Sequence, residues 1–132
     1  CGTNKKLEKT LSRRAARYRR KFLVFGHVDN VDELMEISSI VITKPGGLTT
    51  AEALSKDLPM VIVHPIPGQE AKNTEFLLRQ GVAVKAEDSE DIAVLVQELL
   101  LNTTKLDEMR KRSSELKKPN AAMDIARLVL GV

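Results

Sequence analysis

Residues 40–86, IVITKPGGLTTAEALSKDLPMVIVHPIPGQEAKNTEFLLRQGVAVKA, contain three short apolar runs separated by two stretches with helical spacing. The runs IVIT, MVIVH and VAVKA are almost wholly apolar, which is typical of parallel strands covered on both faces. Gly81 stops the second helical stretch. Because strands here alternate with single helices, the sequence predicts an α/β fold with a doubly wound, Rossmann-like parallel sheet.

Similar patterns continue on both sides of this segment. FLVFG at 22–26 predicts another strand, and VDELMEIS at 31–38 predicts a short helix. Ser89 is the expected N-cap of a helix that runs to about 102, and two further helices are expected near 104–117 and 120–130, with Pro119 between them. An amphipathic helix is expected from 5 to about 20, because apolar residues recur there every three or four positions: Leu7, Leu11, Ala15, Tyr18 and Phe22.

The size of the chain predicts a single domain spanning residues 1–132. Of the 132 residues, 42% are hydrophobic, and no apolar run approaches the roughly 20 residues that a membrane span needs. The single cysteine, Cys1, cannot form an internal disulfide and suits a reducing compartment. A cytoplasmic location is therefore expected.

The net charge of +3 conceals an uneven distribution. Residues 1–21 carry nine Lys or Arg against the single Glu8, a net charge of +8, whereas the other 111 residues carry twelve basic and seventeen acidic side chains, a net charge of −5. The first 21 residues thus form a basic element attached to a mildly acidic domain.

The first unusual loop, KPGG at 44–47, follows the predicted strand IVIT and opens a helix. Free backbone amides and the positive end of the helix dipole favour an anion such as phosphate at this point. The loop matches neither GxxxxGK[ST] nor GxGxxG, so the motif alone is weakly specific. Thr49 and Glu52 stand three residues apart, and a capping box is the structural alternative for Glu52.

The second unusual loop, HPIPGQEAKN at 64–73, follows the strand MVIVH. In parallel sheets ligands bind beyond the carboxyl ends of the strands, so the two loops are expected to converge. Gln69, Glu70 and Asn73 provide donors and acceptors that suit the hydroxyls of a sugar. The alternative is that they form only the polar first turn of the next helix.

Together, ITKPGGLTTAEAL (42–54) and LPMVIVHPIPGQEAKNTEFLLRQGVAV (58–84) resemble the carboxyl-terminal, nucleotide-sugar half of family 28 GT-B glycosyltransferases. Within this family, the segment resembles processive diacylglycerol glucosyltransferases and monogalactosyldiacylglycerol synthases. The similarity extends from about Lys21 to Val84 and fades in the last helices. The resemblance implies a UDP-glucose or UDP-galactose donor, a diacylglycerol acceptor, and inverting transfer of a hexose in glycolipid synthesis.

The resemblance also implies roles for single residues. Glu52 corresponds to the acidic residue that binds both ribose hydroxyls, while Gln69 and Glu70 correspond to residues that contact the donor sugar. The remaining nucleotide-binding positions are implied to face the uracil ring or the diphosphate: His27 and Val28 for uracil, and Gly46, Gly47, Leu48 and Thr49 for the diphosphate.

No catalytic residue is expected within the 132 residues, because in this family the general base and the acceptor groove belong to an amino-terminal domain. The leaving diphosphate is expected to be stabilised by a helix terminus, with no metal and no further cofactor. His64 is interpreted as a strand-end residue, and contact with the sugar or a phosphate is its alternative.

Three other functions remain open at this stage. The basic helix of residues 5–21 fits a non-enzymatic module that binds RNA or an anionic membrane surface. The shortage of aromatic residues argues against nucleic acid, so no nucleic-acid partner is expected, while a lipid acceptor favours peripheral membrane contact. The other two alternatives are a UDP-sugar epimerase and the peptidoglycan N-acetylglucosaminyltransferase.

Cys1-Gly2 matches the end of the family's second strand. The first, central strand of the domain and its glycine-rich loop are therefore expected to be missing, which would leave neighbouring strand edges unpaired. The sequence accordingly predicts a partial domain that is inactive alone as a transferase and binds UDP weakly.

Overall fold

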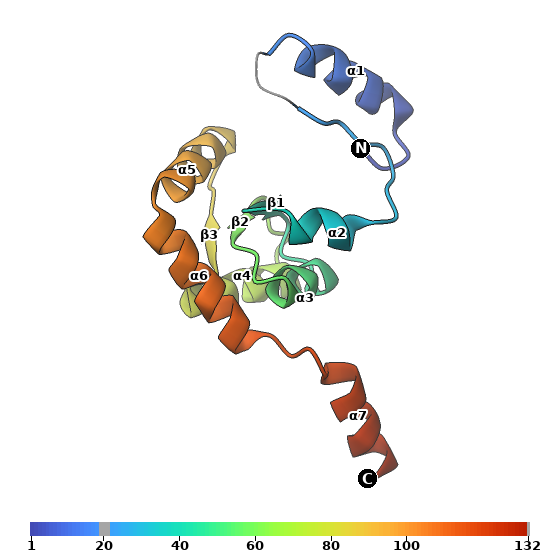
Figure 1. Cartoon of the computed structure of the whole chain (residues 1–132), viewed down its shortest axis with the longest axis vertical. Helices are drawn as coiled ribbons and strands as arrows, with labels where there is room; N and C mark the ends of the chain where they lie inside the picture. Colours follow the sequence, from blue (N-terminus) through green and yellow to red (C-terminus); the bar gives the residue numbers. More distant parts are fainter. Residues whose placement is uncertain (19–21, 132) are drawn as a thin grey trace. The chain divides into compact units, whose positions relative to one another are not determined.

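The computed structural model describes residues 1–18 and 22–131. It divides into two compact units, residues 1–34 and 35–132, and each is described by itself. The elements are labelled in Figure 1. Their bounds are α1 Lys5–Ala15, α2 Val31–Glu36, β1 Val41–Thr43, α3 Gly47–Ser55, β2 Met60–Ile62, α4 Gln69–Gln80, β3 Ala83–Lys85, α5 Ser89–Leu101, α6 Thr103–Leu116 and α7 Ala121–Leu130.

The second unit is built on a three-stranded parallel sheet in the order β1-β2-β3. Val61, at the centre of β2, is in register with Ile42 of β1 and with Val84 of β3. Each pair of neighbouring strands is joined by one helix, α3 or α4. This topology confirms the predicted α/β class and the parallel sheet.

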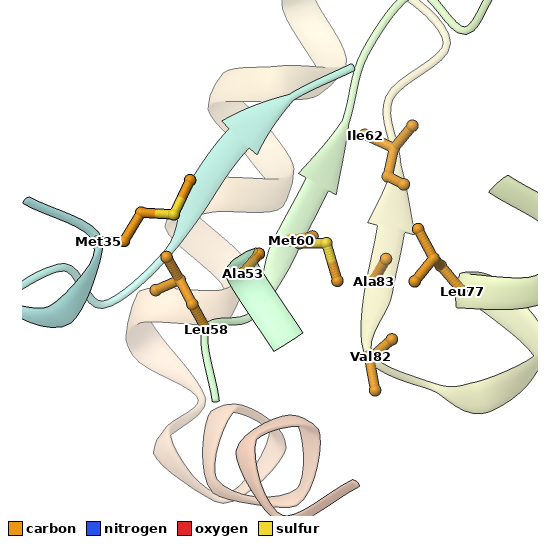
Figure 2. Close-up of a cluster of buried hydrophobic side chains, with 8 residues drawn as sticks. All are labelled: Met35, Ala53, Leu58, Met60, Ile62, Leu77, Val82 and Ala83. Atoms are coloured by element: carbon orange, nitrogen blue, oxygen red, sulfur yellow. The ribbon is translucent and has the colours of Figure 1, made fainter. Parts of the chain in front are cut away.

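The alternating side chains of β2 feed two separate cores, one on each face of the sheet. Met60 and Ile62 belong to a cluster on one face, whereas Val61 belongs to a second cluster with residues of α5 and α6. Figure 2 shows the first cluster gathered around β2. Its members are Met35, Ala53, Leu58, Met60, Ile62, Leu77, Val82 and Ala83. Full burial of one of the larger of these side chains, a Val, Leu, Ile or Met, contributes about 1.5–3 kcal/mol.

The boundaries of the helices follow from their capping residues. Gly81 ends α4 in the left-handed conformation at φ 68°, as predicted, and a Cβ there would clash with the guanidinium of Arg112. The predicted N-cap Ser89 is wrong by one position. The side chain of Asp88 instead accepts hydrogen bonds from the amides of Glu90 and Asp91, because its short carboxylate reaches the first free donors of α5.

Two predictions for the first unit need correction. Helix α1 ends at Ala15 rather than near residue 20, and residues 19 and 20 lie outside the described part of the chain. The predicted strand FLVFG is wrong, since residues 22–25 adopt no regular structure. A strand needs a partner for its backbone amides and carbonyls, and no described strand pairs with this segment.

Strand β1 is an edge of the described sheet, and its only described partner is β2. Ile42 is 48% exposed and lines an apolar groove of about 250 Å³ together with residues before β1 and on α5. None of the described helices is both long and apolar enough to span a membrane.

Candidate functional site

Two loops meet at the carboxyl edge of the sheet. One follows β1 and leads into α3, and the other follows β2 and leads into α4. A hydrogen bond of 2.9 Å from Asn73 Nδ2 on α4 to the backbone oxygen of Pro45 joins the two segments. The expected convergence is therefore present in the structure.

The amino end of α3 presents backbone amides that no described group occupies. Gly46 is the N-cap, and the first hydrogen bond of the helix runs from Thr50 N to Gly46 O at 2.9 Å. The amide of Gly46 itself donates to Lys44 O at 2.9 Å. Among the described residues, no acceptor lies opposite the amides of the next three residues, which are Gly47, Leu48 and Thr49.

Four backbone amides were expected to face a diphosphate, and the structure leaves three of the four open. The amides of Gly47, Leu48 and Thr49 are open, whereas that of Gly46 is used within the loop. Leu48 as a whole residue is 83% exposed, so this helix end lies at the surface of the molecule. An anion at this helix end would meet three donors and the positive end of the helix dipole.

Neither glycine of the loop is required by the described fold. A Cβ built on Gly46 or on Gly47 would have no described heavy atom within 4 Å. Gly46 has φ −67°, which any residue adopts, and Gly47 lies in the first turn of the helix. Glycine costs about 1 kcal/mol relative to alanine inside a helix. The two glycines therefore leave open space beside the free amides. The packing of the described residues does not require this space.

Glu52 lies on the first turns of α3, and its side chain is exposed. Its carboxylate has no hydrogen-bond or ion-pair partner among the residues that the structure describes. The capping-box alternative is wrong, because Gly46 rather than Thr49 is the N-cap and no side chain caps this helix. Glu52 thus has no capping role in the described fold.

The second loop is shaped by its own residues. Gly68 has φ 105°, a conformation that glycine adopts without strain, and is the N-cap of α4. Glu70 Oε2 accepts a hydrogen bond of 2.8 Å from Ile66 N, which closes the loop on itself. Gln69, Glu70 and Asn73 all lie in the first turns of α4, as the structural alternative proposed. Of these side chains, Gln69 is exposed and has no partner within the described residues.

His64 lies two residues beyond the end of β2 in a strained conformation. Its φ is 44°, in the left-handed region that non-glycine residues rarely adopt, and Pro65 follows it. Such strain costs about 1–3 kcal/mol and is concentrated at functional sites. His64 is exposed, and its backbone lies at the same sheet edge as the start of the KPGG loop, since Val63 N donates to Thr43 O at 3.0 Å.

The site described above is built from the second unit alone. His27 and Val28 belong to the first unit, and their expected role at the uracil ring stays a prediction. His27 Nδ1 lies 3.4 Å from Asp29 Oδ1, with both side chains exposed. Within the described residues, no group of three or more His, Cys, Asp or Glu is arranged to hold a metal ion.

Comparison with known proteins is consistent with this geometry. The model of a family described as glycosyl transferases group 1 matches residues 1–116. Processive diacylglycerol beta-glucosyltransferases from Bacillus cereus (strain ATCC 10987 / NRS 248) and Bacillus mycoides (strain KBAB4) are 34% and 33% identical to the chain over 130 residues. The alignments cover 98% of this chain and 34% of each relative, so the chain spans about a third of their length. The predicted resemblance is confirmed, and the chain belongs to the glycosyl transferases group 1 family.

Proposed function

We propose that the chain is the donor-binding part of an inverting glycosyltransferase that moves glucose from UDP-glucose to diacylglycerol. The observation that carries the proposal is the end of α3, where three unpaired amides stand beside two glycines that face open space. The names of the relatives, diacylglycerol beta-glucosyltransferases, support the acceptor and favour glucose over galactose.

The proposed donor fits the site in three parts. The diphosphate accepts hydrogen bonds from the amides of Gly47, Leu48 and Thr49. The carboxylate of Glu52, about one turn further along the same helix, accepts hydrogen bonds from the ribose hydroxyls. The sugar meets Gln69 at the amino end of α4, where the exposed amide both donates and accepts.

In the proposed reaction an acceptor hydroxyl attacks the anomeric carbon, and the bond from that carbon to the diphosphate oxygen breaks. The electron pair of the broken bond stays on UDP, where the α3 amides stabilise the growing negative charge. Attack from the side opposite an α-linked diphosphate gives a β-linked product, in keeping with the relatives' names. The hydroxyl proton passes to a general base that we place outside this chain.

The test is a titration of the ¹⁵N-labelled chain with UDP-glucose, UDP-galactose, UDP-N-acetylglucosamine and inorganic sulfate. We expect nucleotide-dependent shifts of the amides of Gly47, Leu48 and Thr49, with the largest effect from UDP-glucose. Equal shifts from sulfate and from all three donors would reduce the site to a general anion-binding helix end. A preference for UDP-N-acetylglucosamine would favour the peptidoglycan enzyme instead.

Two finer proposals concern activity and location. Because the chain spans about a third of its relatives, we propose that it has no transferase activity alone. We also propose contact with an anionic membrane through α1, which buries none of its residues and carries basic side chains beside the exposed Leu7. Flotation with and without anionic lipid tests this contact, and an RNA gel shift tests the nucleic-acid alternative.

A further inference from the structure

The hydrogen bond from the Asn73 side chain to the Pro45 carbonyl joins the two loops of the site. It is not one of the backbone hydrogen bonds that form α3 or α4. It spans 28 residues of sequence, measures 2.9 Å and is partly buried. Pro45 is among the most deeply buried residues of the chain. Among the described residues, the Asn73 amide is the only donor to the Pro45 carbonyl.

The donor side of this bond is fixed by the core. Asn73 and Leu77 lie one turn apart on the same face of α4, and Leu77 is fully buried in the cluster of Figure 2. Thr74, next to Asn73, is also buried, and its hydroxyl donates to Glu70 O at 2.8 Å. Helix α4 therefore holds the Asn73 amide at a fixed position relative to the sheet.

On the acceptor side, the hydrogen bond fixes the Pro45–Gly46 peptide, which precedes the three open amides. The carbonyl of the Pro45–Gly46 peptide accepts from Asn73, and its amide donates to Lys44 O at 2.9 Å. Both polar groups of this peptide plane are thus held. The next amide along the chain belongs to Gly47, the first of the three open donors.

Fixing this plane matters because the following residue is Gly46, and glycine has the widest choice of backbone conformations. The next peptide, which carries the Gly47 amide, is oriented by the helix itself, since Gly46 O accepts from Thr50 N at 2.9 Å. No side chain caps the helix. The tie from α4 therefore fixes where the first turn of α3 begins relative to the second loop before a ligand arrives, and a ligand then loses less affinity to the ordering of the loop.

We propose that Asn73 is a positioning residue for the donor: it holds the KPGG loop so that the α3 amides point at the diphosphate, and it links this loop to the sugar-contacting end of α4. The inference rests on the proposed function for the identity of the ligand. The ordering of the loop itself depends only on the geometry of the free chain.

The experiment compares Asn73→Ala and Asn73→Asp with the wild-type chain. Asn73→Asp keeps the shape of the side chain but places a carboxylate where a donor is needed. Glu75→Ala, an exposed change on the same helix, is the matched control. The first readout is ligand-free hydrogen exchange and ¹⁵N relaxation of Gly46 and Gly47, and the second is the dissociation constant for UDP.

We expect faster exchange and greater mobility of the Gly46 and Gly47 amides in both Asn73 variants, with Glu75→Ala unchanged. The dissociation constant for UDP should rise about five- to tenfold, the range for losing one hydrogen bond. If Asn73→Ala fails to fold, Asn73→Asp and Asn73→Ser provide the same comparison.

The two readouts separate the failure of this inference from the failure of the proposed function. Unchanged loop mobility in a folded Asn73 variant overturns the positioning role, whatever the chain binds. Greater loop mobility in a chain that binds no UDP supports the positioning role and rejects the nucleotide. A mobile loop with unchanged UDP affinity overturns the claim that the ordering serves the donor.

Discussion

Lys117 Nζ lies 2.8 Å from Asp57 Oδ2, an ion pair that joins the turn after α3 to the end of α6 across 60 residues. The two side chains are 26% and 35% exposed. Asp57 has φ 52°, and its other oxygen, Oδ1, is buried without a partner among the described residues. The ion pair holds this strained turn, which follows α3, against the end of α6.

Removal of the Lys117 ammonium group should destabilise the fold. We expect Lys117→Ala to lower the free energy of unfolding by about 1–2 kcal/mol, because the half-buried carboxylate of Asp57 loses its partner. Lys118→Ala, at the exposed neighbouring position, should change it by less than about 0.5 kcal/mol. Urea denaturation measures both, and equal effects would show that the pair contributes nothing.

Gly47→Ala should move stability and binding in opposite directions. A methyl group at Gly47 meets no described atom and improves helix propensity. The free energy of unfolding should rise by less than the roughly 1 kcal/mol that this change is worth in a helix interior, because Gly47 is the first residue of α3. The same methyl group occupies the space proposed for the diphosphate, and UDP affinity should fall about tenfold or more. Thermal denaturation and NMR titration provide the two numbers. Unchanged affinity would show that the ligand does not enter this space.

Glu52→Gln should weaken UDP binding by about 1–3 kcal/mol, the range for a hydrogen bond to a charged group, while the fold stays intact. The side chain is exposed and has no described partner, so its replacement breaks no internal contact. The loss should disappear with 2′,3′-dideoxyuridine diphosphate, which has no ribose hydroxyls to donate. A loss of the same size with both nucleotides would contradict the ribose assignment.

Gln69→Ala and Glu70→Ala should differ in their effects. Gln69 is free within the described residues, so its loss should weaken UDP-glucose binding and leave UDP binding unchanged. Glu70 closes its own loop through Ile66 N, so its removal should disturb the loop and weaken both ligands. NMR titration of both variants with both ligands measures this. Equal losses for the two ligands in Gln69→Ala would remove that residue from the sugar site.

Patterns that are local in sequence predicted most of the second unit. The apolar runs identified β1, β2 and β3, and Gly81 identified the end of α4, because each depends on side chains within a few residues. The strand predicted at 22–26 failed for the opposite reason. Its apolar residues satisfy the pattern, but a strand forms only beside a partner that the pattern cannot supply.

The candidate site, too, could be predicted from the sequence only in part. The spacing of Gly46, Gly47 and Glu52 could be seen in the sequence, whereas the helix start that frees Glu52 from a capping box could not. The bond between Asn73 and Pro45 joins positions 28 residues apart, and no rule of spacing indicates it. The positive φ of His64 also has no signal in the sequence, because it depends on the path that the chain takes after β2.

The position of β2 also determines how the sheet opens. Met60 N donates to Val82 O and Val63 N to Thr43 O, so the strand is bonded on both sides, and its side chains enter both cores. Its amides can exchange with deuterium only when both cores open together, whereas β1 has one described neighbour and needs less to open. Exchange should therefore proceed from the edge inward. The KPGG loop follows β1, one of the two edge strands of the described sheet, so we expect exchange to reach this loop while the amides of β2 stay protected.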